Sequence, residues 1–132
     1  MFKRSILILL LLSLAACKPP QDKTSANLNS SSSSLKAQIE LAENPKLGPS
    51  VISVYVLDNN QALSGAKVEV TGDMSHAGMV PVISEAVETE AGLYQTKDFE
   101  FTMAGDWILS VLIKTADGKK LNLEKKLSVA GK

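Results

Sequence analysis

Hydrophobic and polar residues alternate with a period of two along most of the chain beyond residue 50. In 51–58, Ile52, Val54 and Val56 occupy alternate positions and so share one face of a strand. The same alternation recurs in three later segments, 66–71, 98–103 and 121–129. Such alternation is typical of antiparallel strands that bury one face. These segments are therefore predicted to be β-strands.

Turn-forming residues separate the predicted strands. They fall at 58–60, 64–65, 71–73, 91–92, 104–106 and 117–118. Segment 107–113 is apolar on both faces and predicts a central strand, whereas 35–42 remains ambiguous between helix and strand. About seven strands at this spacing predict an all-β fold, an immunoglobulin-like antiparallel β-sandwich.

The N-terminus has the pattern of an export signal. Lys3 and Arg4 precede the aliphatic run 6–12, which is too short to cross a bilayer as a helix. The next residues, Leu-Ala-Ala-Cys at 14–17, resemble the lipobox of bacterial lipoproteins, which implies that Cys17 becomes the lipid-bearing first residue. The alternative is a chance match after an ordinary signal peptide.

Cys17 is the only cysteine, so the exported domain has no partner for a disulfide and no further thiolate. The polar, serine-rich stretch that follows cannot bury enough apolar surface to fold by itself and predicts a flexible tether. We therefore expect a signal peptide at 1–16, a lipidated cysteine and disordered tether at 17–34, and one folded domain at 35–132.

Charge and motif content exclude several classes of protein. Without the signal peptide, 12 basic side chains face 14 acidic ones with no basic cluster, which argues against nucleic acid as a partner. Glu85, Glu88 and Glu90 have no histidine or cysteine beside them and are interpreted as a solvated acidic face. The chain also lacks a glycine-rich phosphate loop and a serine elbow, so no enzyme is expected. Lys18 after the cysteine favours the outer membrane of a bacterial envelope, facing the periplasm or the surface.

The order of several short motifs resembles the YtkA-like and FixH-like domains. The motifs are Met-Ser-His-Ala-Gly-Met at 74–79, Gly-Leu-Tyr at 92–94, a Phe-x-Met-x-Gly-x-Trp step at 101–107 and Asp-Gly at 117–118. These domains are immunoglobulin-like modules of exported or membrane-anchored bacterial proteins. The resemblance, over 50–118, implies a β-sandwich, and related modules accompany cation-pump, oxidase-assembly and heavy-metal efflux components. FixH carries a transmembrane anchor where this chain has a lipobox, so a role in oxidase assembly does not transfer.

Met74, His76 and Met79 bring soft sulfur and nitrogen donors into one turn. Thioethers select Cu(I), and imidazole suits copper and zinc. Met74 and His76 are two residues apart, so on an extended strand end they would face the same way. Copper is favoured over zinc, which normally takes more imidazole, carboxylate or thiolate ligands. The alternative is a surface loop with incidental methionine and histidine.

Met103 has two interpretations. It continues the apolar face of 98–103, so its first interpretation is core packing, where methionine fills gaps. Its second is a third sulfur ligand beneath the turn at 74–79. The two functional hypotheses are a lipid-anchored module that binds or delivers Cu(I), and a metal-free structural or protein-interaction module of an envelope complex. In both, Cys17 attaches the chain to the membrane.

Overall fold

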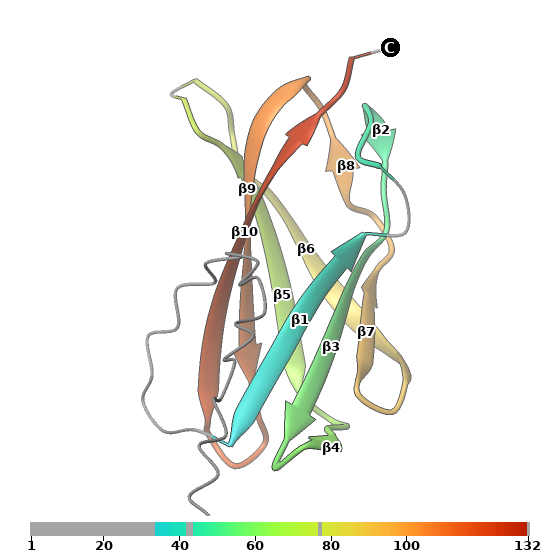
Figure 1. The fold of residues 1–132 in the computed structure, drawn as a ribbon, viewed down its shortest axis with the longest axis vertical. Helices are drawn as coiled ribbons and strands as arrows, with labels where there is room; N and C mark the ends of the chain where they lie inside the picture. The colour runs from blue at the N-terminus through green and yellow to red at the C-terminus, as the bar shows by residue number, and fades with distance from the viewer. Residues whose placement is uncertain (1–33, 42–43, 77, 132) are drawn as a thin grey trace, which may run out of the picture.

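The computed structural model describes residues 34–41, 44–76 and 78–131 of the chain (Figure 1). All regular elements in these ranges are β-strands. Their bounds are β1 Leu35–Leu41, β2 Gly48–Pro49, β3 Ile52–Asp58, β4 Gln61–Ala62, β5 Lys67–Met74, β6 Val82–Glu90, β7 Leu93–Thr96, β8 Glu100–Phe101, β9 Gly105–Lys114 and β10 Lys120–Val129. Across the described ranges, no helix has the length and apolar character to cross a membrane.

The seven longer strands form one antiparallel hydrogen-bonded path, β1-β3-β7-β6-β5-β9-β10. Short β4 pairs antiparallel with the end of β3, and β2 pairs with β8. The two ends of the path approach each other, since Lys125 Nζ on β10 donates a hydrogen bond to the carbonyl of Ile39 on β1 at 2.9 Å. Figure 1 shows β1 and β3 in front of β5 and β9, as two layers. The prediction of an immunoglobulin-like β-sandwich is confirmed.

The core lies between the layers and follows the alternation in the sequence. On β9 the four inward side chains are completely or almost completely buried, and their outward neighbours are only half-buried. Trp107 packs edge-on against Phe101, with ring centroids 5.1 Å apart, and Phe101 packs in the same way against Phe99 at 5.1 Å. Strand β9 lies between β5 and β10, as predicted for a central strand. The ambiguous segment at 35–42 forms β1 over 35–41.

The predicted strand at 98–103 is much shorter in the structure. Only Glu100 and Phe101 form β8, and the chain then bends before β9 begins. Met103 lies in this bend and is 50% exposed, so its interpretation as a core residue is wrong. The Nε1–H of Trp107 donates to the carbonyl of Met103 at 2.9 Å, which fixes the bend beside the core.

Tyr94 connects β7 to the segment that leads into β5. Its hydroxyl donates to the carbonyl of Leu63 at 2.7 Å and accepts from the backbone N–H of Ala66 at 3.1 Å. Burial raises the pKa of this phenol. Just before it, Gly92 has a φ of 76°, and a Cβ there would lie 2.9 Å from the carbonyl oxygen of Val56. Only glycine fits this turn without strain.

A polar cluster joins three segments at the lower end of the sandwich in Figure 1. Lys119 Nζ, in the turn between β9 and β10, lies 2.7 Å from Asp58 Oδ2 at the end of β3. Ser34, directly before β1, donates to the same carboxylate, and Asp117 lies 3.4 Å from Lys119. Hydrogen bonds from Lys119 and Ser34 hold the pKa of Asp58 below its ordinary value, and the bond to Asp58 raises the pKa of Lys119.

A substitution at Gly72 would test the packing of the aromatic core. A Cβ at this position would lie 2.6 Å from Cζ of Phe99 and 3.2 Å from Cζ3 of Trp107. Because the ring must move, we expect Gly72→Ala to lower the free energy of unfolding by about 1–3 kcal/mol in urea denaturation. Gly131→Ala is the control, since its Cβ would make an ordinary 3.8 Å contact with Ala104. Equal stability of the two variants would contradict this packing.

The cluster around Asp58 predicts how stability depends on pH. A carboxyl group whose folded pKa is depressed stabilises the fold above its unfolded pKa, and this contribution is lost as the pH falls through the folded value. We expect the thermal midpoint to drop below about pH 4 and Asp58→Asn to reduce that drop. Glu40→Gln, an exposed carboxylate on β1, is the control and should leave the drop unchanged. For Lys119 the pH dependence is reversed. Its pKa is raised in the folded state, so its interactions stabilise the fold below the unfolded pKa, and this contribution is lost at strongly alkaline pH as the pH rises through the folded pKa.

Candidate metal centre

The loop that contains the predicted donors lies at the end of the sandwich opposite Ser34. Strand β5 runs from Lys67 at the lower end to Met74 at the upper end, and β6 returns from Val82 (Figure 1). The bend between β8 and β9 and the short β2–β8 pair lie at the same upper end. The turn at 74–79 and Met103 therefore belong to one end of the molecule.

Met74 is the last residue of β5 and is packed into the core. It is 6% exposed and lies opposite Trp107 in the β5–β9 register. Its Cε lies 2.9 Å from the position that a Cβ would take at Gly105. Just beyond the strand, the N–H of Ser75 donates to the carbonyl of Asp106 at 3.1 Å, which continues the contact with β9. The Met74 thioether is thus held against the start of β9.

Met79 returns toward the same bend from the other side of the loop. It is half-buried and packs against the hydrophobic core. Its Sδ lies 3.8 Å from Oγ1 of Thr102, which donates a weak hydrogen bond to the sulfur. Met103 follows Thr102 in the chain, so the Met79 sulfur contacts the residue directly before the third methionine.

The three methionines are therefore grouped at one short segment, 102–105, and we call them the methionine group. Met74 contacts its last residue, Met79 contacts its first, and Met103 belongs to it. Their exposure rises from Met74 through Met79 to Met103, from buried to half exposed. Thioethers remain uncharged at every pH, so their grouping incurs no electrostatic repulsion.

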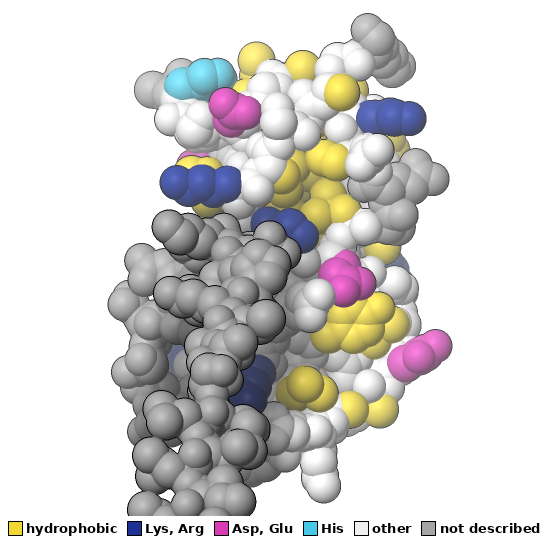
Figure 2. Space-filling model, in the orientation of Figure 1, with side chains coloured by type: hydrophobic (Ala, Val, Ile, Leu, Met, Phe, Trp, Pro, Cys, Tyr) yellow, Lys and Arg dark blue, Asp and Glu magenta, His cyan; other side chains and the backbone are white. Residues whose placement is uncertain are grey.

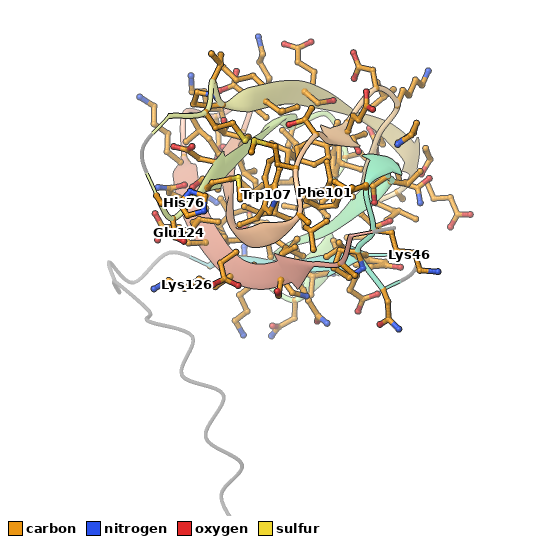
Figure 3. The ribbon with its side chains drawn as sticks, turned by 90° about the horizontal axis from the view of Figure 1, so that it is seen from above. Lys46, His76, Phe101, Trp107, Glu124 and Lys126 are labelled. Atoms are coloured by element: carbon orange, nitrogen blue, oxygen red, sulfur yellow. The ribbon has the colours of Figure 1, made fainter. Side chains whose placement is uncertain are left out.

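His76 lies apart from this group. Strand β5 ends at Met74, so the chain is no longer extended at His76, and the imidazole is exposed while the Met74 thioether is buried. The expectation that these two side chains face the same way is therefore wrong. Figure 3 shows His76 at the edge of the molecule, with Phe101 and Trp107 at its centre.

Other polar groups near this end do not complete a site with His76. In the described ranges, no three histidine, cysteine or carboxylate side chains come together in a metal-binding arrangement. A shallow hollow on the outer face of β9 and β10 is lined by Ser75, Asp106, Trp107, Ile108, Lys126 and Leu127. It contains none of the methionines. Glu85, Glu88 and Glu90 are exposed on β6, toward the lower end.

Two supporting residues were missed in the sequence. Thr102 and Gly105 carry no metal-binding chemistry, yet one contacts the Met79 sulfur and the other provides room for the Met74 methyl group. The Phe-x-Met-x-Gly-x-Trp step contains Gly105, but its spacing alone does not reveal which distant side chain occupies the space above the glycine.

Comparison with known proteins gives a family and two structural neighbours. No curated protein matches the sequence. CopC from Methylosinus trichosporium OB3b superposes with a TM-score of 0.47 at 11% identity, over 71% of this chain and 95% of that one. The PmoD soluble domain from Methylocystis sp. ATCC 49242 (Rockwell) superposes with a TM-score of 0.49 at 13% identity, over 71% and 90%. The sequence profile described as YtkA-like matches residues 29–112, more than half of the chain. The chain belongs to the YtkA-like family.

Proposed function

We propose that the chain is a non-catalytic copper-binding module of the bacterial envelope, which holds Cu(I) at the upper end of the sandwich. The observation that carries this proposal is that the side chains of Met74 and Met79 lie against the segment 102–105, which contains Met103. Three thioethers at one segment would provide soft, neutral donors that suit Cu(I) and disfavour harder cations.

The gradient of burial suggests different roles for the three sulfurs. Met74 is buried against Trp107 and Gly105, so its thioether has a fixed position. Met103 is half exposed and can move without disturbing the core. Cu(I) would be retained by the inner thioethers and would be reached by solvent or by an acceptor protein through Met103. A site of this kind suits binding and transfer better than permanent storage.

His76 is a ligand in this proposal only if its exposed side chain turns inward. The imidazole is attached to the same loop as Met74 and Met79, so it can approach the sulfurs by local rearrangement. Its contribution separates two versions of the site. One has three thioethers alone, and the other adds an imidazole when copper binds.

The proposal includes anchoring through Cys17, which lies outside the described residues. Attachment there would place Ser34 and the lower end nearest the bilayer and leave the methionines at the far end (Figure 1). The outer membrane, with the domain facing the periplasm or the surface, is the favoured location.

A second candidate function, a metal-free interaction module, is favoured by exposed apolar residues on the outer layer. Tyr55 and Leu57 on β3 are 42% and 38% exposed, and Ile83 and Val87 on β6 are 65% and 45% exposed. Figure 2 shows an apolar area over β3 and β7, flanked by acidic side chains. Such a surface is typical of contact with another protein. It lies away from the methionines, so the two functions can be tested separately.

Titration with Cu(I) tests the proposed site. The chain from residue 18 onward would be titrated under reducing conditions against a chromogenic Cu(I) chelator. We expect one equivalent to be retained and Met79→Leu or Met103→Leu to weaken binding at least about tenfold, since each removes one soft donor at nearly constant volume. His76→Ala distinguishes the two versions of the site.

Val80→Ala is the matched control for this titration. Val80 lies in the same loop, is 84% exposed and has no donor atom, so its loss should leave the affinity for Cu(I) unchanged. If the wild-type chain retains no copper, or if the methionine variants bind as tightly as Val80→Ala, the copper function is excluded. The apolar outer layer would then be the surface to investigate.

The position of Met74 can be tested without copper. Gly105 has a φ of 131°, and an added Cβ would meet the Met74 methyl group, so Gly105→Ala should be destabilising. In Met74→Leu, which shortens the side chain, part of that cost should disappear. We expect a coupling of about 0.5–1 kcal/mol in a double-mutant cycle of urea unfolding. Strictly additive effects would mean that the two residues are not in contact.

A further inference from the structure

Three lysines form a row across the outer face of one layer. The strand register places Lys67 on β5 directly opposite Lys114 on β9, and Lys114 directly opposite Lys120 on β10. All three are exposed, and alternation along the strands directs them away from the core. Residues directly opposite each other on neighbouring strands have Cβ atoms about 5 Å apart. We call these three residues the lysine row.

The lysine row is poorly neutralised by the fold. Lys67 lies 3.2 Å from Glu85, but both side chains are 67% exposed, so water screens this pair strongly. Among the ion pairs of the described residues, none includes Lys114 or Lys120. A second acid, Glu69, lies on the same face two residues farther along β5, opposite Glu85. Like charges directly opposite each other destabilise a sheet. The lysine row therefore opposes folding rather than supporting it.

The lysine row also lies beside the point where the chain enters the domain. Lys119, adjacent to Lys120, has its Nζ 3.3 Å from Oγ of Ser34. Ser34 follows Cys17 by 17 residues, which even fully extended can reach no farther than about 60 Å. Any surface that holds Cys17 therefore remains within that distance of the lysine row, while the methionines lie at the opposite end of the sandwich.

We propose that the lysine row binds phosphate groups of an anionic lipid surface and holds the lower end of the β5–β9–β10 face against the membrane. The chemistry required is a set of phosphates spaced along a line or a plane, which three lysines with Cβ atoms about 5 Å apart on neighbouring strands can contact together. Each lysine near an anionic leaflet contributes a modest attraction that falls off within a Debye length. Three such contacts are weak for a free protein and sufficient to orient a tethered one. The inference goes beyond the proposed copper site and does not depend on it, but it rests on the proposed anchoring through Cys17.

The single cysteine allows a direct test. The chain 17–132 would be coupled through Cys17 to a maleimide lipid in vesicles of phosphatidylcholine, with or without about 40% phosphatidylglycerol as the anionic lipid. Lysines would then be acylated with a water-soluble succinimidyl ester, and the rate at each site followed by mass spectrometry. We expect Lys114 and Lys120 to react at least about threefold more slowly on the anionic vesicles and to recover in 0.5 M salt, where screening is nearly complete over about 5 Å.

Lys46, which pairs with Ala130, and Lys126, which pairs with Ile108 near the start of β9, lie away from the lysine row. They are the internal controls and should react at equal rates on both vesicles. Equal protection of these two, or equal reaction of Lys114 on both vesicles, would overturn the proposal. Protection of Lys114 by inorganic phosphate on neutral vesicles, at the level given by anionic lipid, would assign the lysine row to a free anion and exclude the lipid surface.

A pair of charge variants completes the test. In Lys114→Gln/Lys120→Gln, Lys67 should lose its protection on anionic vesicles, because one lysine cannot maintain the contact. Lys46→Gln/Lys126→Gln removes the same charge elsewhere and should leave Lys114 protected. The thermal midpoint of the first variant should equal or exceed that of the wild type, since repulsion within the lysine row is relieved. A lower midpoint would show that the lysine row supports the fold, which would overturn the argument for an external partner.

Discussion

The register of β9 against β5 and β10 is the constraint on which the rest of the molecule depends. It buries four alternate side chains of β9 and pairs Trp107 with Met74 at one end. At the other end it aligns Lys114 with Lys67 and Lys120. A slip of one residue would exchange the inner and outer faces of the strand, so the buried tryptophan fixes the register strongly. The position of Met74 against β9 and the lysine row are both consequences of this single alignment.

Much of the fold could be predicted because its signal is local. Alternation along 51–58 and 66–71 is a property of neighbouring residues, and these segments form β3 and β5 as expected. The turn predicted at 71–73 is wrong, because Gly72 lies inside β5 and makes room for the ring of Phe99. The segment 98–103 differs because its apparent alternation continues past the point where the chain bends. That bend is held by Trp107 bonding to the carbonyl of Met103, a contact that depends on how the aromatic core packs.

The candidate site was predictable in composition but not in arrangement. The sequence identifies Met74, His76, Met79 and Met103 as its few soft and nitrogen donors. Which of them come together depends on where β5 ends. Met74 is the last residue of the strand and is buried, whereas His76, two residues later, lies outside the strand and is exposed. The lysine row could not be predicted from the sequence for a similar reason. Its members are separated by 47 and 6 positions in the sequence and become neighbours only through strand pairing.

Trp107 is the only tryptophan in the chain, and it is buried between Phe101 and the methionine group, with its indole N–H bonded to the carbonyl of Met103. The tryptophan fluorescence of the protein therefore originates at one point, beside the segment 102–105. Any event that moves Met103, opens the bend or brings a heavy ion near the indole changes the colour or the intensity of that emission. Trp107 is thus an intrinsic fluorescence probe, which requires no label and reports on the end of the sandwich remote from Ser34.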